Sequence, residues 1–248
     1  MLFRSVDATD ANFGDALKLR VKETVKPVVT FVTPSDGAGL TNAQPTIKVR
    51  VTDVGAGVDL STFALKIDGG TAIPASACTQ EAVTNGYELT YTPDSALADG
   101  NHTITAVVGD YDDNTADTAS ITIKIDTVPP VLNVSAPANN SFTNNATVTV
   151  EGDTNDVTSS PVTLTIQVND GTAENVTVGA DGSFSHDVTL AEGENTIKIV
   201  STDALGKFTE VTRTVTLDTT APVFTEVTVA PNPVDCGATY KISVKVSS

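Results

Sequence analysis

The chain has 248 residues, of which 40% are hydrophobic and 5% aromatic, and it contains no Trp. Its 14 basic and 31 acidic residues give a formal net charge of −17 at pH 7. Such a charge repels nucleic acids and anionic membrane surfaces, so we expect no nucleic acid partner. No apolar run reaches the roughly 18 residues of a membrane-spanning helix, so we expect no direct membrane insertion in this segment.

The first residues resemble the last hairpin of a repeat. Residues 6–21 (VDATDANFGDALKLRV) share with residues 200–217 (VSTDALGKFTEVTRTVTL) a TDA turn, a short loop, a Phe and an alternating strand. We therefore predict that residues 1–26 hold the terminal hairpin of a truncated preceding repeat. Residues 1–5 (MLFRS) match the translated end of a common sequencing adaptor, so we interpret them as an assembly scar, with a natural start as the alternative.

The first complete repeat is predicted over residues 27–126. Alternating runs rich in Val, Ile and Thr predict strands, because these side chains fit a pleated, half-buried surface. Residues 71–84 (TAIPASACTQEAVT) break the alternation and predict a loop with a short edge strand. The other predicted strands lie near residues 28–32, 46–52, 62–68, 86–92, 102–109 and 118–125.

The second complete repeat is predicted over residues 128–218, and residues 219–248 are predicted to be the first strands of a truncated third repeat. Asp-Gly pairs at 170–171 and 181–182 supply the turn residues that tight hairpins need. Seven short strands separated by such turns indicate an immunoglobulin-like β-sandwich. The predicted strands are residues 131–135, 146–151, 162–168, 174–178, 183–190, 195–201 and 208–217.

A proline hinge recurs at each predicted boundary. The hinge prolines Pro27, Pro130 and Pro222 lie 103 and 92 residues apart, which is about the length of one sandwich. Proline fixes its own φ angle and restricts the preceding residue, so each hinge samples few conformations. The predicted fold class is therefore all-β, with tandem immunoglobulin-like β-sandwiches joined by short proline hinges.

Several segments carry a family resemblance. Residues 34–68, residues 92–110 and residues 184–203, together with the DTVPP and DTTAP hinges, resemble the bacterial and archaeal Ig-like repeats of large surface proteins. Such repeats also occur as accessory modules of polysaccharide-degrading enzymes. The resemblance covers nearly the whole chain and implies the fold and membership of a repeat array. It implies no catalytic residues, because these families share none.

Acidic loops supply candidate calcium ligands. Calcium takes six to eight oxygen ligands, which acidic loop residues can provide. The alternative is that Asp and Asn hydrogen-bond their own backbone in turns or cap the hinges, and EF-hand spacing is absent. No other cofactor is expected. The candidates are Asp53 and Asp59 on one loop, Asp110, Asp112 and Asp113 in the last turn of the first repeat, and Asp126 and Asp218 before the hinges, where Glu23 replaces Asp in the first copy.

Catalytic constellations are not recognisable. His102 and His186 lie in different repeats, and we expect His102 to be a packing or hydrogen-bonding residue. No Ser falls in a nucleophile motif with His and Asp, and the sequence has neither a phosphate-binding glycine loop nor a Cys/His metal cluster. We therefore predict that the chain is not an enzyme. Tyr111 is the one candidate for an aromatic side chain that stacks on a sugar ring.

These features favour a mechanical role. We predict a spacer or stalk segment of a secreted or cell-surface multi-repeat protein, with adhesion as a further role, located extracellularly or at the cell surface. Its predicted partners are the neighbouring Ig-like repeats of the same polypeptide. Two alternatives stay open: an accessory module of a secreted polysaccharide-degrading enzyme, and a display domain of a phage tail protein.

Overall fold

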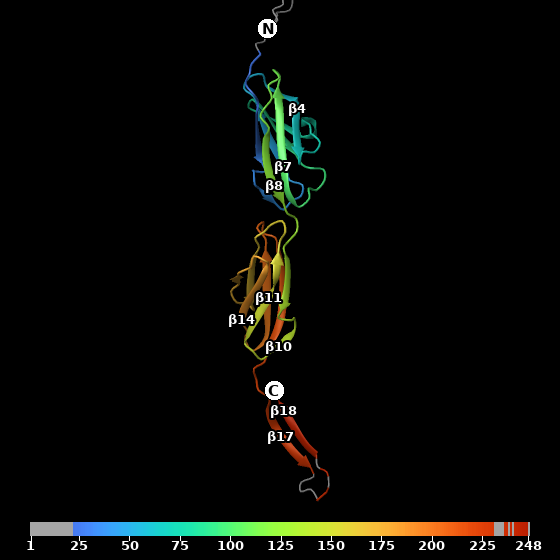
Figure 1. Cartoon of the computed structure of the whole chain (residues 1–248), viewed down its shortest axis with the longest axis vertical. Helices are drawn as coiled ribbons and strands as arrows, with labels where there is room; N and C mark the ends of the chain where they lie inside the picture. Colours follow the sequence, from blue (N-terminus) through green and yellow to red (C-terminus); the bar gives the residue numbers. More distant parts are fainter. Residues whose placement is uncertain (1–21, 231–235, 238, 240, 248) are drawn as a thin grey trace, which may run out of the picture. The chain divides into compact units, whose positions relative to one another are not determined.

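A computed structural model describes residues 22–230, 236–237, 239 and 241–247 of the chain. Apart from a short 3-10 turn at Ala75–Ala77, the secondary structure of these residues is β-strand, which confirms the predicted all-β class (Figure 1). The hairpin predicted over residues 1–26 and the interpretation of residues 1–5 fall on residues 1–21, outside the described part. No helix within the described residues is long and apolar enough to cross a membrane.

The chain divides into two compact units, one up to Ile125 and one from Asp126 onward. In the first unit, two four-stranded sheets form a sandwich that we call the first sandwich. Its first sheet has the strand order β1-β3-β6-β5 and its second the order β2-β8-β7-β4. The strands are β1 Val28–Thr33, β2 Gly39–Leu40, β3 Ile47–Thr52, β4 Val58–Ile67, β5 Thr79–Val83, β6 Gly86–Tyr91, β7 Gly100–Asp110 and β8 Ala119–Ile125.

Alternation in the sequence builds the core of the first sandwich. In β3, Ile47, Val49 and Val51 are at most 1% exposed, whereas Lys48 and Arg50 between them point away from the core. Successive residues of a strand face opposite sides of its sheet, so one face of each sheet is apolar. The core lies between the two faces and includes Leu89 of β6 and Ile123 of β8.

The second unit contains the second sandwich, with sheet orders β14-β11-β9 and β10-β16-β15-β12-β13. Its core is separate and is formed by Leu, Ile, Val and Phe residues between Leu132 and Leu217. Two further strands, β17 Val223–Ala230 and β18 Lys241–Ser247, pair as an antiparallel hairpin where the first strands of a third repeat were predicted. The strands of the sandwich are β9 Val131–Ala136, β10 Ser141–Thr143, β11 Thr147–Asn155, β12 Thr163–Val168, β13 Glu174–Val176, β14 Ser183–Thr189, β15 Gly193–Thr202 and β16 Phe208–Leu217.

The predicted strands are confirmed, with differences at four places. Strand β11 continues to Asn155, four residues beyond its predicted end, because Asp153, Thr154 and Asn155 pair with β9. Strand β4 begins at Val58 rather than near residue 62, because Val58 and Asp59 pair with the end of β7 across a register shift. The short strands β2 and β10 were not predicted. Each pairs in parallel with the last strand of its sandwich, β2 with β8 and β10 with β16.

Candidate carboxylate sites at the ends of the sandwiches

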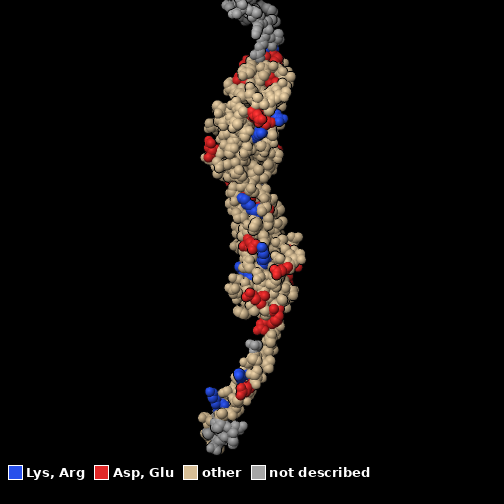
Figure 2. Space-filling view, turned by 180° about the vertical axis from the view of Figure 1, so that it is seen from behind, with Lys and Arg blue, Asp and Glu red and all other residues tan. Residues whose placement is uncertain are grey.

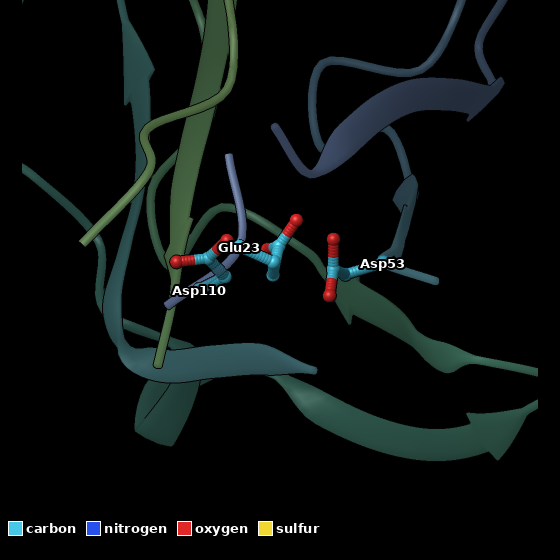
Figure 3. A group of neighbouring side chains, drawn as sticks. All are labelled: Glu23, Asp53 and Asp110. Carbon is cyan, nitrogen blue, oxygen red and sulfur yellow. The ribbon is translucent and has the colours of Figure 1, made fainter. Parts of the chain in front are cut away.

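Acidic side chains gather at one end of the first sandwich. Glu23 precedes β1, Asp53 follows β3 and Asp110 ends β7, and oxygen atoms of these three side chains lie within 4.8 Å of one another. In the view of Figure 3 the Glu23 carboxylate lies between those of Asp53 and Asp110. Asp53 and Asp110 are buried, and Glu23 is half-buried. We call these residues the first trio.

The loop after β3 is folded around Asp53. Its Oδ2 accepts the N–H groups of Gly55 at 3.0 Å and Gly57 at 2.6 Å. A Cβ atom at Gly55 would lie 2.6 Å from the carboxyl carbon of Glu23, so only glycine lets the loop approach that side chain so closely. The other oxygen, Asp53 Oδ1, is buried and has no hydrogen-bond partner within the described structure.

Asn114 forms hydrogen bonds with the other two members of the first trio. Its Nδ2 donates to Asp110 Oδ2 at 2.7 Å and to Glu23 Oε1 at 3.2 Å. Asp110 Oδ1 accepts the N–H groups of Asp112 and Asn114, both at 2.8 Å. Burial alone raises the pKa of Asp110, but these hydrogen bonds outweigh it and hold the pKa below its ordinary value. Asp110 is therefore a hydrogen-bonded carboxylate at neutral pH.

A second group of carboxylates occupies the corresponding end of the second sandwich. Asp126 lies between β8 and β9, Asp156 follows β11 and Asp203 follows β15, and their carboxylate oxygens lie within 4.8 Å of one another. Asp126 is 0% exposed, and Asp156 and Asp203 are 7% and 6% exposed. We call these residues the second trio. All three members are more completely buried than Glu23 of the first trio.

Loop N–H groups reach only one oxygen of each carboxylate in the second trio. Five backbone N–H groups converge there, and all of them donate to Oδ1 atoms. This leaves the Oδ2 atoms without loop contacts. The donors are Val128 to Asp126 at 3.2 Å, Thr158 and Ser159 to Asp156 at 2.7 and 2.6 Å, and Leu205 and Lys207 to Asp203 at 2.7 and 3.0 Å.

The second trio is poorly neutralised. Asp126 Oδ2 and Asp203 Oδ2 are buried and have no hydrogen-bond partner among the described residues. Lys207 is the nearby cation, but its Nζ donates to the main-chain oxygen of Asp126 at 2.7 Å. None of the salt bridges between described residues involves Asp126, Asp156 or Asp203.

The remaining calcium candidates lie outside both trios and have partners of their own. Asp59 and Asp218 accept N–H groups of their own turns, as turn chemistry requires, whereas Asp112 and Asp113 bind the segment that precedes β1. Asp59 Oδ1 accepts the N–H of Ser61, Asp112 Oδ2 accepts the N–H of Glu23, Asp113 pairs with Lys22 at 2.7 Å, and Asp218 Oδ1 accepts the N–H of Thr220.

The structure thus brings together Asp53 and Asp110 in one trio and places Asp126 in the other. Asp156 and Asp203 were missed, although the repeat register could have identified them. Asp156 follows β11 as Asp53 follows β3, and Asp203 follows β15 where Asp110 ends β7. Glycines flank Asp53 and further acids flank Asp110, which made the first pair conspicuous, whereas Asp156 and Asp203 have neither signal.

His102 is a structural hydrogen-bonding residue, as predicted. It is buried in β7, where Nδ1 lies 2.7 Å from Asp68 Oδ2 and Nε2 lies 2.7 Å from the main-chain oxygen of Ala98. Burial alone lowers the pKa of His102, but these two acceptors outweigh it and raise the pKa above its ordinary value. The charged ring therefore clamps the start of β7 to the β4–β5 connection.

Two family models match the chain. Residues 27–106 match the model described as bacterial Ig domain, and residues 130–219 match the model described as glucodextranase, domain B. The two matches fall on the first and the second sandwich. No curated protein matches the chain.

Solved structures of similar fold are multi-domain chains. The fibronectin(III)-like modules of Clostridium thermocellum CbhA are 15% identical, with a TM-score of 0.40, over 77% of this chain and 94% of theirs. Sidekick-1 immunoglobulin domains 1–5 are 12% identical, with a TM-score of 0.47, over 91% of this chain and 46% of theirs. Rst D1-D2 is 12% identical, with a TM-score of 0.46, over 77% and 99% of the two chains.

The family matches agree with the sheets and cores described above. The first match runs from the start of the first sandwich into β7, and the second match covers all strands of the second sandwich. Each sandwich has two sheets and a hydrophobic core of its own. The resemblance to bacterial Ig-like repeats is therefore confirmed, by the bacterial Ig domain match to the first sandwich. The chain is built of tandem immunoglobulin-like β-sandwich domains, the second of which matches glucodextranase domain B.

Proposed function

We propose that the chain is a spacer segment of a secreted or cell-surface protein with many Ig-like repeats. The observation that carries this proposal is that each sandwich closes its own core and is joined to the next element by a short segment containing proline. Only residues 126–130 connect β8 to β9, and residues 218–222 connect β16 to β17. Repeats with separate cores transmit force and add length without any chemistry of their own.

The surface and the family support this environment. Bacterial Ig domains typically occur in extracellular proteins, and a net charge of −17 disfavours nucleic acid and anionic membrane as partners. On the face in Figure 2, basic side chains occur singly or in small groups. The partners that we propose are neighbouring Ig-like repeats of the same polypeptide.

A reach assay tests the spacer role. The chain is inserted between a surface anchor and an epitope tag on a cell that carries a thick capsule, and binding of an antibody to the tag is measured. A spacer increases antibody binding over the same anchor without an insert, and two tandem copies of residues 27–218 increase it further. Equal antibody binding with no copy, one copy and two copies contradicts the proposal.

A second candidate function has one observation in its favour. The match of residues 130–219 to glucodextranase domain B favours an accessory module of a polysaccharide-degrading enzyme. Electrophoresis of the chain in gels with and without soluble polysaccharides tests it. Retarded migration that is lost in Tyr111→Ala, where the exposed ring could stack on sugars, supports the accessory role. Unchanged migration in every polysaccharide tested contradicts it.

A further inference from the structure

We propose that the second trio, Asp126, Asp156 and Asp203, is a divalent-cation site whose preferred ion is calcium. The site lies at the end of the second sandwich where the chain enters β9, and it belongs to that unit alone. Its existence does not depend on the spacer role, because it rests only on contacts within the second unit.

The two oxygens of the trio's carboxylates differ in their hydrogen-bond partners. Every loop N–H group that reaches the trio binds an Oδ1 atom. At Asp126 and Asp203 the other oxygen, Oδ2, is buried and finds no partner in the described part of the chain. A buried polar atom with no partner is costly, and nearly all such atoms in proteins are satisfied. The loops therefore hold the carboxylates in place and leave oxygens available to a ligand that supplies positive charge.

The close packing of three buried carboxylates is electrostatically costly. Three carboxylates meet within 4.8 Å, and none is more than 7% exposed. Removing carboxylates from water and placing them side by side both penalise the charged forms. Lys207 relieves this penalty only in part, because its ammonium group binds the main-chain oxygen of Asp126 and none of the three carboxylates. A divalent cation neutralises two of the three charges and satisfies the free oxygens at once.

The chemistry of the trio selects calcium. All donors are carboxylate oxygens, and zinc, in contrast, prefers nitrogen and sulfur. Oxygens on a shell about 2.3 to 2.6 Å from calcium are separated by at most about 5 Å, and the separations in the trio stay within 4.8 Å. Magnesium requires a tighter octahedral shell and retains water, so it fits such a set of fixed carboxylates less well.

The first trio provides the internal contrast. There Asn114 Nδ2 donates to both Glu23 and Asp110, which places hydrogen-bond donors where the second trio has none. Among the described residues, the one buried oxygen of that trio without a hydrogen-bond partner is Asp53 Oδ1. Calcium dependence is therefore assigned to the second sandwich.

Asp203→Asn is the informative variant for testing the site. The amide oxygen can still accept the N–H groups of Leu205 and Lys207, and the amide nitrogen replaces the unpartnered Oδ2 with a donor. Asp156→Asn serves as a second variant, because its amide oxygen can still accept the N–H groups of Thr158 and Ser159 while one carboxylate charge is removed. The control is Asp181→Asn, an exposed turn aspartate of the same sandwich whose Oδ1 likewise accepts a turn N–H, that of Ser183.

The experiment is calorimetry of the full chain after removal of metals, with calcium chloride or chelator. Calcium at 100 times its Kd raises the melting midpoint of the second sandwich by roughly 10 to 20 °C. Asp203→Asn and Asp156→Asn weaken calcium binding at least about tenfold and so reduce the calcium-induced shift to about half or less. In chelator each of them melts no lower than the unsubstituted chain, because charge repulsion is relieved. Asp181→Asn keeps the full shift.

Three outcomes overturn the site. One is that millimolar calcium leaves the unsubstituted chain unshifted. Another is that Asp203→Asn and Asp156→Asn retain the calcium shift. The last is that both variants are destabilised equally with and without calcium, because that result assigns the trio to turn hydrogen bonding alone.

Discussion

Single aspartates at strand ends hold the loops that follow them through hydrogen bonds. Asp53, Asp156 and Asp203 each accept two N–H groups of the next loop with one oxygen. An aspartate can bind two turn N–H groups without blocking its second oxygen. Turn chemistry and cation binding were alternatives when the sequence alone was considered, and the geometry makes them compatible within one side chain.

Only some residues of the two trios could be recognised from the sequence. Asp53, Asp110 and Asp126 were identified because they stand beside glycines, further acids or a proline hinge. Asp156 lies between Asn155 and Val157, and Asp203 between Thr202 and Ala204, so neither stands in a glycine-paired loop or at a proline hinge. Their significance depends on which loops meet at the end of a sandwich, and local sequence does not encode that meeting.

The His102 clamp predicts a pH dependence of the first sandwich. The raised pKa of His102 means that its contribution is complete below about pH 6.5 and is lost as the pH rises through the folded pKa. Burial raises the pKa of Asp68, but hydrogen bonds from His102 and Thr103 outweigh it and lower the pKa, so the Asp68 contribution is lost only as the pH falls below about 4. The clamp stabilises most between these limits.

Thermal melts followed by tyrosine fluorescence, which reports on the first sandwich through Tyr87 and Tyr91, measure this effect. We expect the melting midpoint to be lower at pH 9 than at pH 6, and the difference to shrink in His102→Gln. The same replacement at His186, in the other unit, leaves the difference unchanged. An undiminished pH difference in His102→Gln contradicts the clamp.

At the scale of the element, alternation in the sequence located the long strands but not the short ones. Strands such as β3 and β8 bury every second residue, so period-two patterning identifies them. Strands β2 and β10 span two and three residues, too few to show a period. They exist because the last strand of each sandwich offers them a parallel partner, which is a tertiary effect.

The close approach of β9 to β11 at Gly152 can be tested by substitution of this glycine. A Cβ atom there would lie 2.0 Å from the main-chain oxygen of Asn133 on β9 and 2.7 Å from the ring of Phe184 on β14. We expect Gly152→Ala to lower the free energy of unfolding of the second sandwich by about 1 to 3 kcal/mol, because the backbone must shift. Urea denaturation measures this change.

The control for Gly152→Ala is Ser185→Ala, which lies on the exposed face of β14. We expect it to change the free energy by no more than about 0.5 kcal/mol. Equal stability of Gly152→Ala and Ser185→Ala would mean that β9 and β11 do not approach as described.

At the scale of the whole molecule, the chain consists of two units with separate cores. The fold class could be predicted from the sequence because strand patterning, turn residues and a recurring hinge all indicated the same architecture. The family matches support each sandwich separately, on residues 27–106 and 130–219. The division of the chain at Ile125 and Asp126 agrees with the two cores.

Mechanical stretching of single molecules of the full chain tests the central claim, that the chain is a series of independently folded repeats, each of which resists force. Each sandwich has about 90 to 100 residues, so its rupture releases about 30 nm of contour length at about 3.6 Å per residue. We predict two discrete unfolding events of this size in each trace. A single event of about 60 nm, or smooth extension without discrete events, would contradict the account.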